Sequence, residues 1–210
     1  MSRDRLLLRQ ERWCIILLVE HFLKQVEVQT DGIRQAILQL KQRDTPGLVD
    51  DGGFDGIIAV SWPLDFATYF RSPPPARSDM LTDACDSALR ALARKRGWNL
   101  TAVAKVFTSV RDADYRLEVE RAKRCRSPDG TKSARVTYSV DRDEFTVCVE
   151  IAGPKKQPLL REIVYRDRPS AAAYVDRALK KPFWKSETQL IIPFENPNIK
   201  KQRLVIKVPG

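Results

Sequence analysis

Two segments with alternating side chains decide the fold of the C-terminal region. Residues 134–151 read ARVTYSVDRDEFTVCVEI, and the parts 134–140 and 144–151 each place apolar or β-branched residues at nearly every second position. The three residues between them, Asp141-Arg142-Asp143, have the short polar composition of a hairpin turn. The stretch therefore predicts two adjacent antiparallel strands.

Further strands are predicted on the C-terminal side of this hairpin. Residues 159–165, 188–194 and 203–208 have strand composition. After the first of them, Asp167 and Pro169 predict the start of a helix that reaches Leu179. The order β-β-β-α-β-β favours a mainly antiparallel sheet, with packed helices in the C-terminal two thirds of the chain.

The N-terminal region is predicted to be a helical hairpin. Residues 5–28 carry an apolar stripe at helical spacing, and Asp31 is placed to cap a second helix. One face of that second helix would consist of Ile33, Ile37 and Leu40. With the strands, this predicts an α+β protein.

The middle of the chain contains a turn, a strand and several helices. Residues 50–56 are mostly Asp and Gly and predict a flexible turn, residues 57–62 a short buried strand, and residues 63–70 a brief helix. Three consecutive prolines make residues 71–78 a semi-rigid linker. We expect a helical N-terminal region at residues 1–70 and a basic α+β region at residues 79–210. One continuous domain with a proline-rich loop at 71–78 is the alternative.

Two helices are predicted around Gly97. Ser78 is placed to cap the first helix, which Gly97 ends, and Asn99 to cap the second. This outline fits a helix-turn-helix whose second helix continues through Arg116–Arg126. The match is weak, because Asp112 and Asp114 would face phosphates, and a plain helical hairpin packed on a sheet is the preferred interpretation.

The charge of the chain points to a polyanionic partner. The 210 residues are 43% hydrophobic and 30% charged, a globular composition, with a formal net charge of +10. Residues 1–70 carry 8 Lys and Arg against 10 Asp and Glu, whereas residues 71–210 carry 29 against 17. We therefore expect contact with nucleic acid or an acidic protein in the C-terminal two thirds.

The cysteines and the apolar runs suggest a cytoplasmic, reducing location. None of the four cysteines lies within 22 residues of another, so neither metal-ligand spacing nor a disulfide framework is indicated. Cys125 lies between Arg124 and Arg126, which favours its thiolate. The longest apolar run, residues 13–19, is too short to span a membrane.

No complete catalytic or cofactor motif is present. The single histidine, His21, lies in an apolar helix without a nearby nucleophile, so we expect no catalytic residues, cofactor or metal. A metal-dependent nuclease is the weakest of three hypotheses. Its candidate ligands are Asp141, Asp143, Glu144 and Glu150, but Ala152 stands where such a site needs a lysine.

Basic residues interleaved with aromatic ones are the best-supported functional feature. Cations can neutralise phosphates while rings stack on unpaired bases, and this favours a non-catalytic nucleic-acid-binding protein, without distinguishing DNA from RNA. The alternative is a regulatory module that binds an acidic protein, with any homo-oligomer formed through the N-terminal helices. In a purely structural interpretation, Phe183 and Trp184 would close the core. The predicted nucleic-acid-binding residues are Arg94, Lys95, Arg96, Arg166, Arg168, Lys180, Lys181, Trp184, Lys185, Lys200 and Lys201.

Overall fold

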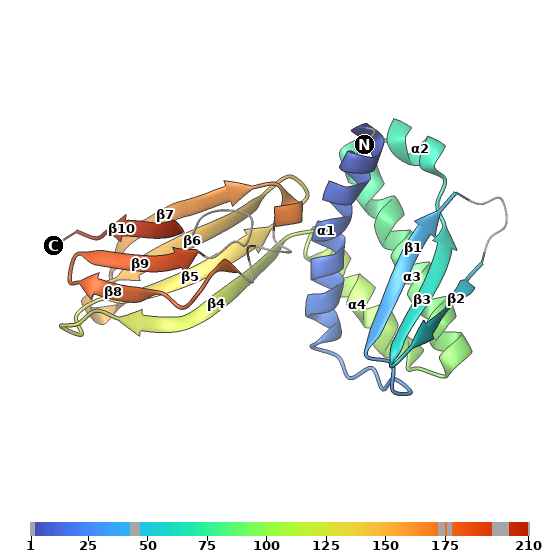
Figure 1. Cartoon of the computed structure of the whole chain (residues 1–210), viewed down its shortest axis with the longest axis horizontal. Helices are drawn as coiled ribbons and strands as arrows, with labels where there is room; N and C mark the ends of the chain where they lie inside the picture. Colours follow the sequence, from blue (N-terminus) through green and yellow to red (C-terminus); the bar gives the residue numbers. More distant parts are fainter. Residues whose placement is uncertain (1–2, 43–46, 172–174, 176–177, 195–201, 210) are drawn as a thin grey trace. The chain divides into compact units, whose positions relative to one another are not determined.

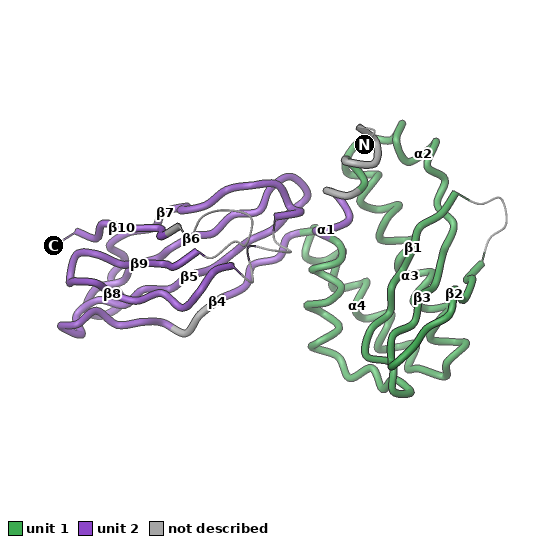
Figure 2. Tube along the Cα trace, in the orientation of Figure 1, with its two compact units in different colours: residues 1–8, 15–115 green, residues 9–14, 116–210 purple. Residues whose placement is uncertain are grey.

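The chain forms two compact units, which Figure 2 distinguishes by colour. The computed structural model describes residues 3–42, 47–171, 175, 178–194 and 202–209. Residues 1–8 and 15–115 form the first unit, here the helix–sheet unit, and residues 9–14 and 116–210 form the second, here the sandwich unit. Helices and antiparallel strand pairs are both abundant, so the predicted α+β class is confirmed.

The helix–sheet unit packs helices on a three-stranded sheet of order β1-β3-β2. Strand β1 runs parallel to β3, and β2 runs antiparallel to it. Figure 1 shows α3 running behind this sheet. Ile58 and Val60 of β3 are buried against Leu92, Val103 and Phe107 from the helices. The elements are α1 (Arg3–Leu23), β1 (Gln35–Lys41), β2 (Val49–Phe54), β3 (Ile57–Pro63), α2 (Phe66–Arg71), α3 (Pro74–Arg96) and α4 (Leu100–Asp112).

The predicted second helix of the N-terminal hairpin is wrong, because residues 35–41 form strand β1. Ile33, Ile37 and Leu40 fit helical spacing, but residues 35–41 also alternate, and parallel pairing with β3 decides between the two. Asp31 does not cap a helix. Its carboxylate accepts a hydrogen bond of 3.0 Å from the indole Nε1 of Trp98.

The aspartate- and glycine-rich segment is a strand followed by a tight turn. Residues 49–54 form β2, which pairs with β3 across a bulge near Asp51. Residues 50–56 were expected to form a flexible turn, and only Asp55 and Gly56 at the end of β2 do so. Asp55 and Gly56 have φ values of 45° and 74°, the left-handed pair that a two-residue hairpin needs.

Helices α3 and α4 form the predicted helical pair around Gly97. Gly97 ends α3 with a φ of 71°, and the Asn99 side chain caps α4 by accepting from the Ala102 amide. Helix α3 begins at Pro74, not at Ser78, because prolines are tolerated in a first turn whose N–H groups have no partner. Residues 74–78 therefore belong to a helix and not to a linker.

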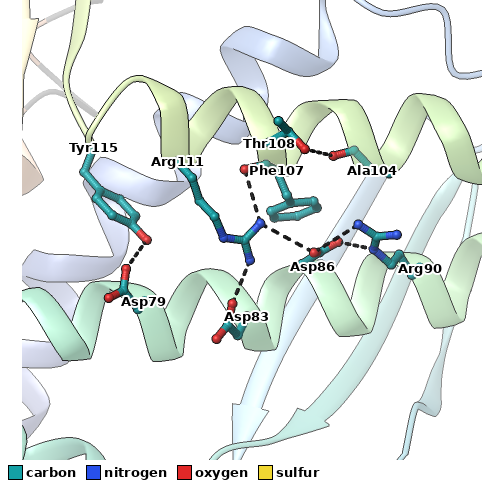
Figure 3. A network of polar contacts seen from close by, with 9 residues as sticks. All are labelled: Asp79, Asp83, Asp86, Arg90, Ala104, Phe107, Thr108, Arg111 and Tyr115. Atoms are coloured by element: carbon teal, nitrogen blue, oxygen red, sulfur yellow. Dashed lines mark hydrogen bonds and ion pairs between the residues drawn. The ribbon is translucent and has the colours of Figure 1, made fainter.

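A polar network fastens α3 to α4, as Figure 3 shows. The Arg111 guanidinium donates to Asp83 at 2.6 Å and lies 3.7 Å from Asp86. The Tyr115 hydroxyl donates to Asp79 at 2.6 Å, and burial raises the pKa of this phenol to about 12. These contacts, with the buried apolar face of α4, identify the pair as a helical hairpin packed on a sheet.

The sandwich unit consists of two antiparallel sheets packed face to face. One has the order β4-β5-β6-β7 and the other β10-β9-β8. Tyr165 of β7 stacks on Phe194 of β9 with ring centroids 5.5 Å apart, which joins the two sheets. The elements are β4 (Leu117–Arg126), β5 (Ser133–Val140), β6 (Phe145–Ala152), the 3-10 turn η1 (Pro154–Lys156), β7 (Pro158–Asp167), the 3-10 turn η2 (Pro169–Ala171), β8 (Phe183–Ser186), β9 (Gln189–Phe194) and β10 (Gln202–Lys207).

The predicted 134–151 hairpin is confirmed, as are the strands corresponding to β7, β9 and β10. A helical continuation through Arg116–Arg126 is wrong, because this segment is strand β4. Helix α4 ends at Asp112, and the left-handed residues Asp114 and Tyr115 turn the chain away from the helix axis. The helix predicted from Asp167 to Leu179 lies partly outside the described residues, which show η2 at its start and helical backbone at Val175 and Ala178.

Among the described residues, no helix combines the length and the apolar composition needed to cross a membrane.

Candidate nucleic-acid interface

The net charge of the chain belongs almost entirely to the sandwich segment. Residues 116–210 carry 21 Lys and Arg against 12 Asp and Glu, a net of +9, whereas residues 1–115 carry 16 against 15. A polyanion would therefore be attracted to the sandwich unit far more than to the helix–sheet unit.

The outer face of the four-stranded sheet neutralises its own charges. Glu120 of β4, Arg135 of β5, Glu150 of β6 and Arg161 of β7 form a row with one member on each strand. The successive N–O distances in the row are 3.0, 3.5 and 3.4 Å. Because each cation in this row already contacts a carboxylate, the row offers little attraction to phosphate.

The outer face of the three-stranded sheet has a different composition. Phe183, Ile191 and Val205 are direct cross-strand partners and form an apolar row over β8, β9 and β10. Phe183 and Val205 are 46% and 50% exposed, so the ends of the row are open to solvent. Side chains alternate along a strand, so Arg203 and Lys207 lie on the same face as Val205.

Cations flank this apolar row on both sides. Lys207 pairs with Gln189 beyond one side, and Arg203 pairs with Pro193 beyond the other. The amide of Lys180 donates to the Pro193 carbonyl at 3.0 Å, which places Lys180 beside the Arg203 end. Lys185 is exposed at the register shift that follows Trp184. We call this surface the basic face: Lys180, Phe183, Lys185, Ile191, Arg203, Val205 and Lys207.

Carboxylates are scarce in the described segments that form the basic face. In residues 179–194 and 202–209 the charged side chains are Lys180, Lys181, Lys185, Arg203 and Lys207, against the single carboxylate of Glu187. Within the described part of the chain, Lys185, Arg203 and Lys207 have no ion-pair partner.

The two aromatic residues of the predicted motif face opposite ways. Trp184 pairs with Leu190, whose side chain is fully buried between the sheets. The indole Nε1 of Trp184 donates a hydrogen bond to the Cys125 carbonyl at 3.2 Å. This geometry supports a structural role for Trp184. Phe183 presents the exposed ring.

The other predicted residues of the sandwich unit have varied positions. Arg166 contacts Glu144 at 3.3 Å, and Arg168 is exposed at the end of β7. Lys181 is exposed just before β8. Lys200 and Lys201 lie outside the described residues.

The predicted cluster Arg94-Lys95-Arg96 lies in the helix–sheet unit, and two of its members bind carboxylates. Lys95 contacts Asp50 at 2.8 Å, and Arg96 contacts Asp31 at 3.1 Å. Hydrogen bonds from Lys95 and Trp98 lower the pKa values of Asp50 and Asp31, respectively. Arg94 is exposed in the last turn of α3.

The predicted site residues do not include Phe183, Ile191, Arg203, Val205 or Lys207, although the sequence holds a signal for the last three. Residues 203–208 were expected to be a strand, and alternation alone puts Arg203, Val205 and Lys207 on one face. Which face meets solvent depends on the second sheet, and the local sequence does not show that.

The positions of Cys125 and Asp141 favour structural roles. Burial raises the pKa of the Cys125 thiol, in contrast to the lowering expected from Arg124 and Arg126. Asp141 accepts hydrogen bonds from the amides of Asp143 and Glu144, as a turn residue does. Within the described ranges, no three His, Cys, Asp or Glu side chains gather as a metal site would require.

Comparison with known protein families, curated proteins and solved structures found no match for this chain.

Proposed function

We propose that this protein is a non-catalytic nucleic-acid-binding protein and that the basic face is its binding surface. The observation that carries the proposal is an apolar row whose two ends, Phe183 and Val205, are exposed, flanked by cations with few carboxylates among the described residues of the same segments. Cations attract the phosphate backbone, and the apolar row offers contact to bases or sugars between them.

A salt titration with a labelled oligonucleotide tests the proposal. Four cations that contact phosphates would make log affinity fall with log salt at a slope of about −3 to −4. The triple variant Lys185→Gln/Arg203→Gln/Lys207→Gln should reduce the steepness of that slope by about 2 to 3. Absence of binding at low salt would contradict the proposal.

The matched control removes the same charge elsewhere. Lys105→Gln/Lys155→Gln/Lys156→Gln takes three exposed cations from α4 and η1 and leaves the basic face intact. It should bind like the wild type apart from a small loss of long-range attraction. If both triple variants lose affinity equally, binding follows net charge and the basic face is not the site.

The alternative hypothesis is that the same cations bind an acidic partner protein. Polyglutamate offers carboxylates without bases, so it serves as the probe for this alternative. The nucleic-acid proposal requires the oligonucleotide to bind more tightly than polyglutamate of equal charge at equal salt. The reverse order would favour an acidic protein as the partner.

A separate observation favours self-association as a second function. The described helices pack on the face of the β1-β3-β2 sheet that carries Ile58 and Val60. On the other face Ile37, Val49 and Phe54 are 42%, 40% and 76% exposed. Charges of both signs border this face, in the pairs Arg34–Asp55 and Lys41–Asp51.

A second copy of the chain fits such a surface better than a strongly charged partner. Residues 1–115 are nearly neutral, so two copies of this unit would not repel each other, and mixed charges can pair across a two-fold axis. Sedimentation over a range of concentrations tests this: Phe54→Ser should shift the protein toward the monomer. A wild type that stays monomeric at every concentration would rule self-association out.

A further inference from the structure

We infer that the basic face selects single-stranded nucleic acid, with an unpaired base stacked on Phe183 and the backbone held by the flanking cations. This inference rests on the proposed function and adds to it the class of nucleic acid bound.

The exposure of Phe183 is the first argument. Its neighbour Trp184 and the cross-strand residues Leu190 and Ile206 already fill the inner side of these strands. Phe183 is directed to the opposite side and leaves nearly half of its surface in water. An exposed ring on the face of a sheet, next to a second apolar side chain, is the arrangement on which sheet-based binders stack bases.

The spacing of the cations is the second argument. Arg203 and Lys207 each lie two residues from Val205, which places them about 7 Å along the strand on either side of the apolar row. The two cations are therefore about 14 Å apart along β10, far enough to contact phosphates on the two sides of a base that lies on the row. The row crosses three strands, a width of about 10 Å, which accommodates one base on Phe183 and a neighbouring group against Val205.

The geometry of duplexes is the third argument. In a duplex the bases are paired and stacked, so a flat protein surface meets mainly phosphates, and Phe183 would have no base to contact. The cations would still attract a duplex. The ring should therefore contribute to the binding of single strands alone, while the cations contribute to the binding of both forms.

The test uses three substitutions of one residue. Phe183→Ala removes the ring, Phe183→Leu keeps apolar bulk without a ring, and Phe183→Tyr keeps a ring. The probes are single-stranded polypyrimidine DNA, the matching RNA, a fully paired hairpin duplex, and heparin, a polyanion without bases. Unfolding of each variant is measured in parallel, and all three should keep the stability of the wild type because the side chain is exposed.

Stacking predicts a specific pattern of affinities. Phe183→Ala and Phe183→Leu should weaken single-strand binding about 5- to 150-fold, the range for loss of one stacked base, whereas Phe183→Tyr should bind as the wild type does. Affinity for the duplex and for heparin should not change. The DNA and RNA probes show which of the two single strands is preferred.

Failure of the inference and failure of the proposed function give different results. If Phe183→Leu binds single strands as the wild type does, or if Phe183→Ala lowers heparin affinity equally, base stacking is refuted while polyanion binding stands. If the wild type binds none of the four probes at low salt, the proposed function itself is refuted.

Discussion

The indole Nε1 of Trp184 donates a hydrogen bond to the Cys125 carbonyl, 3.2 Å away, and so links strand β8 of one sheet to β4 of the other. The donor and the acceptor are 59 residues apart in the chain. A contact of this kind joins the edges of the two sheets of the sandwich.

Replacement of Trp184 should therefore cost stability. Trp184→Ala should lower the free energy of unfolding by about 3 kcal/mol, because it removes a large half-buried ring and leaves the Cys125 carbonyl without this donor. The adjacent Phe183→Ala is the control and should change it by no more than about 0.5 kcal/mol. Urea unfolding followed by circular dichroism measures both. A Trp184→Ala protein of native stability but weak oligonucleotide binding would place Trp184 in the binding site.

The Arg135 guanidinium should contribute a small, salt-dependent stabilisation. It contacts Glu120 at 3.0 Å and Glu150 at 3.5 Å, and all three side chains are partly exposed. Arg135→Gln should cost about 0.5–1 kcal/mol at low salt and less at high salt. A double-mutant cycle with Glu120→Gln isolates the pair, and a coupling energy that salt leaves unchanged would contradict the ionic interpretation.

The Asp129 carboxylate should make stability depend on acidity. It accepts hydrogen bonds from Ser127, from the Thr131 amide and from the Thr131 hydroxyl, and these lower its pKa to about 2. The unfolded value is near 4, so the folded state holds the charged form more strongly. The stabilisation is complete above about pH 4 and disappears as the pH falls through about 2.

Thermal unfolding of the wild type and of Asp129→Asn, measured from about pH 2 to neutrality, gives this contribution. The variant should be less stable than the wild type near neutrality, and the difference should shrink as the wild-type carboxylate becomes protonated. Asp143→Asn, in the next hairpin turn, controls for the loss of one negative charge. A constant difference between wild type and Asp129→Asn across the range would show that the carboxylate is not the cause.

All four cysteines should be reduced thiols. In the structure Cys14, Cys85, Cys125 and Cys148 form no disulfide bond. Denatured, unreduced protein should therefore give four equivalents with a thiol reagent. In the native protein Cys14 and Cys85 should react slowly, because burial raises their pKa values to about 12 and leaves little thiolate at neutral pH. Two or fewer equivalents after denaturation would indicate a disulfide.

Five strands of the sandwich, β5, β6, β7, β9 and β10, were predictable because their signal is local, whereas β4 and β8 were not predicted. In residues 134–151 the alternation and the turn at Asp141 are complete within one hairpin, and the observed register joins the expected partners. Strand β1 gave an ambiguous signal, because the spacing of Ile33, Ile37 and Leu40 also suits a helix. Its partner β3 begins 22 residues after β1 starts, and no short window of sequence shows a parallel pairing across that separation.

The candidate site was predictable in composition but not in orientation. The sequence shows that lysines and aromatic residues gather around Phe183 and Trp184. It does not show which ring is buried, because that depends on the packing of β8 against the four-stranded sheet. Arg203 and Lys207 of β10 lie on the same face as Phe183 because β10 pairs with β9. The local sequence does not show that pairing either.

The row Glu120–Arg135–Glu150–Arg161 also has a consequence for folding specificity. Arg135 lies opposite Glu150 on β6, and Glu150 lies opposite Arg161 on β7. A slip of two residues between β5 and β6 would keep apolar side chains facing inward, so burial alone opposes it only weakly. The same slip would place Arg135 opposite Cys148 or Ala152 and would separate it from Glu150. The alternating charges thus help to fix which residues pair when the sheet assembles.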